Sequence, residues 1–232
     1  MGRRKLKALV FSLLAHGSPE EIFRFSEEVP AYILIHYLFL ALCHPDEQVR
    51  WNSVHCFGRI VPRLAEEDPE EARVVMRRFL WSLNDESGGI GWGCPEAMAE
   101  IMCYSPLLRD EYLHMLISYM RKDGKELHQD GNYLELPMLQ RGLLWGVARL
   151  CQLHGEEMAR KKIVDDVTPY LESTDPHVVA LAIWTLGLLG CGDRIKKRGL
   201  LKNSTESIRL YRNGRFENVS LKKLLEETDT SS

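Results

Sequence analysis

Apolar residues recur with helical spacing over most of the chain. Leu6, Leu9, Val10, Leu13 and Leu14 fall on one helical face and predict an amphipathic first helix. The alternation that is typical of strands does not occur before residue 208. The pattern therefore predicts about ten helices, near 4–16, 19–28, 31–43, 46–63, 69–83, 95–104, 106–122, 137–153, 156–172 and 176–190.

Capping residues followed by proline indicate where several of these helices begin. Ser18-Pro19-Glu20-Glu21 combines a capping serine, a first-turn proline and a capping-box glutamate. The pairs Asp68-Pro69, Ser105-Pro106 and Asp175-Pro176 have similar chemistry. Pro169 is expected to kink or end the helix predicted at 156–172, because an interior proline lacks the N–H that a helix needs.

The end of the chain changes character. Residues 208–219 alternate around Asn213-Gly214, which predicts a β-hairpin. Ser220 can then cap a short helix at 221–227. An isolated hairpin is marginally stable in water, so we expect it to lean on the last helices and to cover the open end of the helical array. The expected division is a helical domain at 1–192 and a capping segment at 193–232.

The apolar stretches form a repeat. Asp46 and Asp175 are each followed by valine three residues later, and by glycine twelve residues later, at Gly58 and Gly187. Two looser copies place Ala99 and Ala148 at the position of the glycine. The units begin at 41-, 49- and 39-residue intervals, at Val49, Ile90, Leu139 and Val178. A period of this length is typical of a helical solenoid, in which stacked helix pairs share one core.

This unit resembles the HEAT-repeat family of armadillo-like proteins, whose repeat reads roughly Asp-x-x-Val-Arg followed by small and apolar residues. The resemblance covers about residues 40–190. It implies a right-handed α-solenoid of about five helix pairs, with the C-terminal hairpin and short helix appended. Arg50 alone occupies the family's arginine position, so the family's Asp–Arg ladder is expected only in the Asp46–Arg50 region.

The loop Asn84-Asp85-Glu86-Ser-Gly-Gly-Ile-Gly-Trp92-Gly is similar to the hallmark of a small group of bacterial HEAT-like proteins with no assigned activity. This loop, at 84–94, and a second one at 123–136 interrupt the simple repeat. Loops of this length in a compact array are usually functional or disordered. Equivalent loops of stacked repeats line up along one edge, so their polar residues are expected to be neighbours.

Composition narrows the choice of partner. The 232 residues contain 30 basic and 33 acidic side chains, a net charge of −3, which does not favour nucleic acid. None of the six cysteines forms a C-x-x-C pair, which favours a reduced, cytoplasmic protein. The longest apolar runs, 31–43 and 178–191, are too short to span a bilayer.

Known enzyme motifs are largely missing. The HEAT-like deoxyhypusine hydroxylases bind iron through His-Glu dipeptides, and this chain has no such dipeptide. The glycine loop follows no strand and lacks the lysine of a phosphate-binding loop. Helical-repeat DNA glycosylases are a further comparison, but Trp145 and Trp184 lie in apolar stretches that predict core positions. A non-enzymatic role is favoured, although the residues do not decide it.

Two functions remain. The first is a protein-interaction or scaffold module that uses its curved face and the two loops to bind a protein partner. The alternative is a metal- or small-ligand-binding protein, with enzymatic activity left open, because carboxylates and imidazoles suit divalent metals. No cofactor is expected under the first hypothesis, and a divalent metal is the candidate under the second. The candidate ligand-binding residues are Asn84, Asp85, Glu86, Trp92, Glu96, Glu100, His128, Asp130 and Glu135.

Overall fold

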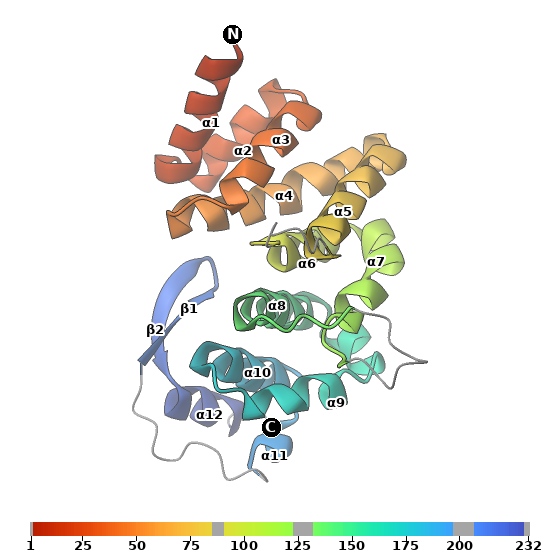
Figure 1. Cartoon of the computed structure of the whole chain (residues 1–232), viewed down its shortest axis with the longest axis vertical. Helices are drawn as coiled ribbons and strands as arrows, with labels where there is room; N and C mark the ends of the chain where they lie inside the picture. Colours follow the sequence, from red (N-terminus) through yellow and green to blue (C-terminus); the bar gives the residue numbers. More distant parts are fainter. Residues whose placement is uncertain (1, 85–90, 123–131, 197–206, 230–232) are drawn as a thin grey trace. The chain divides into compact units, whose positions relative to one another are not determined.

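The computed structural model describes residues 2–84, 91–122, 132–196 and 207–229 (Figure 1). The chain forms two compact units, Met1–Leu116 and Ile117–Ser232, called here unit 1 and unit 2. The division expected at residues 192 and 193 stays a prediction.

Unit 1 is built from helices. They are α1 (Arg3–His16), α2 (Pro19–Glu28), α3 (Ala31–Leu42), α4 (Glu47–Glu67), α5 (Pro69–Asn84), α6 (Cys94–Tyr104) and most of α7 (Pro106–Ser118). Ser18 accepts from the backbone N–H of Glu21 and so completes the predicted capping box. Asp46 likewise accepts from the N–H of Gln48, at 2.8 Å, at the start of α4. These helix starts were predicted correctly because a cap is a local interaction.

The core of unit 1 centres on aromatic packing between α3, α4 and α5. The rings of Phe39, Phe57 and Phe79 lie 4.6–5.0 Å apart between centroids. Phe57 and Phe79 are completely buried. The small residue of the repeat has the expected role at Gly58, where a Cβ atom would lie 2.5 Å from the Cγ of Glu100 on α6. Glycine therefore allows α4 and α6 to approach closely.

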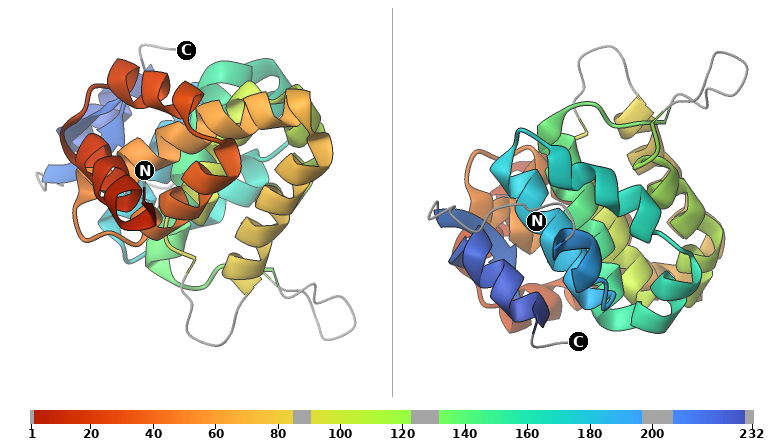
Figure 2. Two further views of the ribbon diagram at one scale, coloured as in Figure 1. Left: turned by 90° about the horizontal axis from the view of Figure 1, so that it is seen from above. Right: turned by 90° about the horizontal axis from the view of Figure 1, so that it is seen from below.

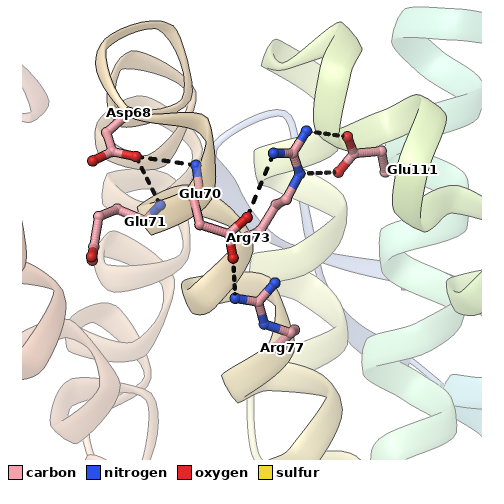
Figure 3. A network of polar contacts seen from close by, with 6 residues as sticks. All are labelled: Asp68, Glu70, Glu71, Arg73, Arg77 and Glu111. Atoms are coloured by element: carbon pink, nitrogen blue, oxygen red, sulfur yellow. Dashed lines mark hydrogen bonds and ion pairs between the residues drawn. The ribbon is translucent and has the colours of Figure 1, made fainter.

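Ion pairs join the outer helices of unit 1 (Figure 3). Arg73 on α5 binds both carboxylate oxygens of Glu111 on α7, at 2.8 and 2.6 Å. Glu70 accepts from Arg77 at 2.6 Å, and Asp68 caps α5 by accepting from the N–H groups of Glu70 and Glu71. A bidentate arginine–carboxylate pair fixes geometry as well as charge, so this network aligns α5 with α7.

Unit 2 combines helices with a hairpin. Its elements after α7 are α8 (Pro137–Arg160), α9 (Val164–Val167), the 3₁₀ helix η2 (Thr168–Glu172), α10 (Pro176–Leu188), α11 (Gly192–Lys196), β1 (Ser207–Arg212), β2 (Arg215–Ser220) and α12 (Leu221–Asp229). The strands are antiparallel, with Ile208 opposite Val219 and Tyr211 opposite Phe216. Asn213 and Gly214 form the predicted turn with φ angles of 52° and 77°. The hairpin and its short helix are thus confirmed.

The structure bears out the break predicted inside residues 137–172 but divides the second part further. Helix α8 runs from Pro137 to Arg160 with non-helical backbone at His154 (φ −134°, ψ 41°), between the helices predicted at 137–153 and 156–172, and residues 156–172 do not form one continuous helix. The chain then continues as the short α9 and η2, with Pro169 in the first turn of η2. The predicted helix at 106–122 also ends early, at Ser118. Within the described ranges, no helix is long and apolar enough to cross a bilayer.

Candidate functional site

The four repeat units place equivalent positions on α4, α6, α8 and α10. The residues two positions after each unit start are Trp51, Trp92, Arg141 and Ala180. Those six positions after the start are His55, Glu96, Trp145 and Trp184. We call the surface around these positions the repeat face. In unit 1 it belongs to α4 and α6, and in unit 2 to α8 and α10.

In unit 2 the repeat face is covered by the chain's own hairpin, which lies beside α8 and α10 (Figure 1 and Figure 2). The indole N–H of Trp145 donates to the backbone carbonyl of Tyr211 on β1 at 2.8 Å. Trp145 and Trp184 are only 5% and 8% exposed, so their predicted burial is confirmed. Part of what buries them is an extended strand from a distant part of the sequence.

Arg212 anchors the hairpin on this face. Its guanidinium carbon lies 5.8 Å from the ring centroid of Trp184. The same guanidinium pairs with Glu217 on β2 and Glu227 on α12, each at 2.9 Å. Both carboxylates therefore come from the C-terminal segment, and the repeat face contributes the aromatic ring.

In unit 1 the repeat face is formed by different side chains. Trp51 and His55 on α4, Trp92 before α6 and Glu96 on α6 are all half-buried. Gly93, which precedes α6, has a φ of 70°, and a Cβ there would lie 2.9 Å from a side-chain carbon of Leu42. Glycine therefore permits the tight turn that brings Trp92 and Glu96 to this face.

Glu100 is a buried acid with a partner. Its side chain is only 3% exposed, and its Oε1 lies 3.1 Å from Nδ1 of His55. The space for it exists because residue 58 on α4 is glycine. A buried carboxylate needs hydrogen-bond or charge partners, and His55 supplies one.

Glu96, one turn before Glu100 on α6, is less well satisfied. Its Oε2 is buried and has no hydrogen-bond partner among the described residues. Desolvation raises the pKa of Glu96 to about 7, opposed by the backbone N–H of Glu96 and by the charge of Arg50. This carboxyl therefore changes protonation state near neutral pH, and its buried Oε2 is an acceptor without a donor among the described residues.

The structure brings together some of the predicted site residues and not others. Trp92 and Glu96 lie on the repeat face of unit 1, and Glu100, one turn along α6, is buried against His55. Asn84 is exposed at the end of α5, and Glu135 is exposed before α8 in unit 2. The remaining candidates, Asp85, Glu86, His128 and Asp130, lie outside the described residues.

The metal-binding alternative gains no support from the described part of the chain. No three histidine, cysteine, aspartate or glutamate side chains are grouped there so that they could hold an ion. Unit 2 does contain an open cleft of about 600 Å³ next to Tyr133 and Tyr170. Several of its polar groups already have partners: Arg121 pairs with Asp166, and buried Gln140 donates to the carbonyl of Leu134 at 2.8 Å.

One inter-repeat ion pair was not predicted from the sequence. Arg141 on α8 donates to both oxygens of Asp175, the capping residue of α10, with Nε at 3.1 and 3.0 Å. Arg50, at the family position, instead donates to the carbonyl of His44 and pairs with Glu47 at 3.5 Å. The Asp–Arg contact was expected near Asp46–Arg50 in unit 1. It occurs instead in unit 2, and its arginine lies two residues after the start of the repeat unit, where the family has it one residue after the start.

Comparisons with known proteins establish the fold. No family model matches the chain. An uncharacterized protein of Archaeoglobus fulgidus is 26% identical over 209 residues, which are 87% of this chain and 96% of that protein. A designed armadillo repeat protein superposes over 99% of this chain and 94% of its own, with a TM-score of 0.52 and 13% identity. The chain has an armadillo-like α-solenoid fold.

The predicted fold class, an all-α solenoid with a C-terminal hairpin and short helix, is thereby confirmed. A second solved structure, of computationally designed armadillo repeat proteins for modular peptide recognition, covers 99% of this chain and 94% of its own, at a TM-score of 0.46 and 10% identity. The bacterial subgroup that the 84–94 loop suggested stays a prediction.

Proposed function

We propose that this α-solenoid is a non-enzymatic interaction scaffold that binds an extended segment of a partner protein on the repeat face of unit 1. The observation that carries the proposal is the hairpin on unit 2. There the equivalent face already binds an extended strand, with the Trp145 indole donating to the backbone carbonyl of Tyr211. Solenoid proteins commonly bind partners on such repeated surfaces.

The side chains of the unit 1 face suit this role. Trp51 and Trp92 are half-buried, so each retains accessible ring surface. Indole rings combine a large apolar area with an N–H donor, which is why tryptophan contributes strongly to binding surfaces. The proposal requires no cofactor, and the net charge of −3 gives no general attraction to nucleic acid.

The test is a selection of displayed random peptides on the full chain, followed by affinity measurements with the selected peptides. We expect Trp51→Ala and Trp92→Ala each to weaken binding about tenfold or more, because central tryptophans often contribute above 1.4 kcal/mol. Trp81→Ala is the matched control, since Trp81 lies on α5 of the same unit and is 77% exposed.

The proposal requires Trp81→Ala to bind the same peptides within about twofold of wild type, as expected for a residue outside the contact. Urea unfolding of each variant separates lost binding from lost folding. If no peptide is enriched, or if the enriched peptides bind the Trp51→Ala/Trp92→Ala double variant as tightly as wild type, this face is not the binding surface.

A further inference from the structure

We infer that Glu96 binds a basic side chain, a lysine ammonium or an arginine guanidinium, of the segment that occupies the unit 1 face. This inference rests on the proposed function and specifies the chemistry of the partner. It starts from the buried Oε2 of Glu96, which lacks a hydrogen-bond partner among the described residues. A buried acceptor without a donor carries a desolvation cost that a ligand donor can remove.

The groups around Glu96 do not supply the hydrogen-bond donor that its buried oxygen lacks. Glu100, one turn along α6, already faces His55 at 3.1 Å. Arg50 on α4 acts on Glu96 through its charge, but its Nη1 donates to the carbonyl of His44 at 3.2 Å. The thiol of Cys94 lies near Glu96 on the same helix, and the thiol of Cys43 lies near Cys94. None of these groups donates to the buried oxygen of Glu96.

Comparison with unit 2 favours a cation over a neutral donor. There, the segment on the repeat face presents Arg212 to Trp184 and brings its own carboxylates, Glu217 and Glu227. Glu96 occupies the repeat position that corresponds to Trp184. In unit 1 the face itself therefore supplies the carboxylate, and the bound segment needs to supply only the cation. Such charge-assisted hydrogen bonds are about twice as strong as neutral ones.

The tryptophans of the unit 1 face are compatible with the same ligand. Trp51 and Trp92 are both half-buried on this face. A lysine or arginine near an indole ring gains cation–π attraction, and its aliphatic stem packs against apolar surface. The face thus offers aromatic contact for the stem and a carboxylate for the charged group.

Binding is expected to depend on pH. Because burial raises the pKa of free Glu96 to about 7, the carboxyl is partly protonated at neutral pH. A bound cation stabilises the ionised form, so binding releases a proton and the affinity rises as pH increases through 7. The affinity of a basic peptide is therefore expected to be higher at pH 8 than at pH 6.

The experiment uses peptides selected on the full wild-type chain and their variants. We expect one position to be enriched in lysine or arginine. Glu96→Gln should weaken these peptides about tenfold, in line with the loss of one charged hydrogen bond. Peptides with norleucine at that position should bind wild type and Glu96→Gln within about twofold, because the double-mutant cycle then contains no coupled pair. Glu66→Gln, at an exposed position on α4, is the charge-matched control.

The outcomes separate the two proposals. Enriched peptides that depend on Trp92, but show no basic preference or no coupling to Glu96, would overturn this inference and leave the proposed function intact. An affinity that does not change between pH 6 and pH 8 would also contradict it. Absence of any Trp92-dependent peptide would instead reject the proposed function itself.

Discussion

The same repeat positions carry different side chains in the two units. In unit 2 they are Trp145 and Trp184, both nearly buried, with the hairpin bound to the indole of Trp145. In unit 1 they are His55 and Glu96, which are half-buried beside Trp51 and Trp92. The repeat fixes where a helix presents a side chain, whereas the residues at those positions differ between the face that the hairpin covers and the face that we propose binds a partner.

Replacement of a tryptophan should give the largest difference in stability between the two faces. Trp145→Ala is expected to lower the free energy of unfolding by about 3–5 kcal/mol, because it leaves a cavity and removes the hydrogen bond to the Tyr211 carbonyl. Trp92→Ala should cost less, about 1–2 kcal/mol, since Trp92 is only partly buried. Urea unfolding measures both values. Equal losses would mean that the two faces do not differ in the proposed way.

Close approach of helices in unit 1 can be tested at Gly58. Gly58→Ala should destabilise the protein by roughly 2 kcal/mol, because the new methyl group overlaps Glu100. Gly155→Ala on α8 of unit 2 is the counterpart, with no atom within 4 Å of the added Cβ. It should be neutral or stabilising by up to about 1 kcal/mol. Thermal and urea unfolding would show whether the two substitutions have opposite signs.

The pH dependence of stability should differ once Glu96 is replaced. Its pKa is raised from 4.5 in the unfolded reference to about 7 in the folded chain, so the folded state holds its proton more tightly. The tighter proton binding therefore stabilises the folded state in full below pH 4.5, and this stabilisation is lost as pH rises through about 7. In wild type, the free energy of unfolding should fall by roughly 1–2 kcal/mol between pH 5 and pH 8 because of Glu96, after allowance for solvent screening. Glu96→Gln should lack this fall.

The measurement is urea unfolding of wild type and Glu96→Gln at pH 5 and pH 8. Glu66→Gln serves as the control for a general change in net charge. A stability difference between the two pH values that is identical in wild type and Glu96→Gln would contradict the buried placement of the Glu96 carboxyl.

The smallest effects are expected at Arg141, which makes the Asp–Arg contact between repeats, and at Arg50, which occupies the family's arginine position. Arg141→Gln should cost about 1 kcal/mol, because Arg141 makes a bidentate pair with the largely buried Asp175. Arg50→Gln should cost less than about 0.5 kcal/mol, because its pair with Glu47 is local and partly exposed to solvent. The two variants compared by urea unfolding would show whether the ladder contact belongs to unit 2 alone. A larger loss for Arg50→Gln would reverse that assignment.

Local sequence signals predicted the helices well because caps and turns are made by neighbouring residues. Ser18, Asp46 and Asp175 cap their helices, and Asn213-Gly214 turns the hairpin, as their patterns indicated. The kink at His154 falls between the helices predicted at 137–153 and 156–172, but residues 156–172 form shorter pieces, with Pro169 in the first turn of η2.

The candidate site was harder to predict because its contacts join distant residues. Glu96 and Glu100 were selected for their four-residue spacing, but their different environments depend on α4, where His55 contacts Glu100. The link from Trp145 to Tyr211 spans 66 residues and leaves no local signal. The signal that does group His55, Glu96, Trp145 and Trp184 is their shared place six residues after each repeat start.

The hairpin also has a consequence for the order of events during synthesis. Trp145 and Trp184 precede β1 in the chain, so a ribosome completes α8 and α10 before the strand that covers them. Until residues 207–220 have emerged, the nascent protein lacks the strand that completes the burial of these two indoles. This interval is a time at which a chaperone, or a competing strand from another molecule, has access to the position that the hairpin later fills.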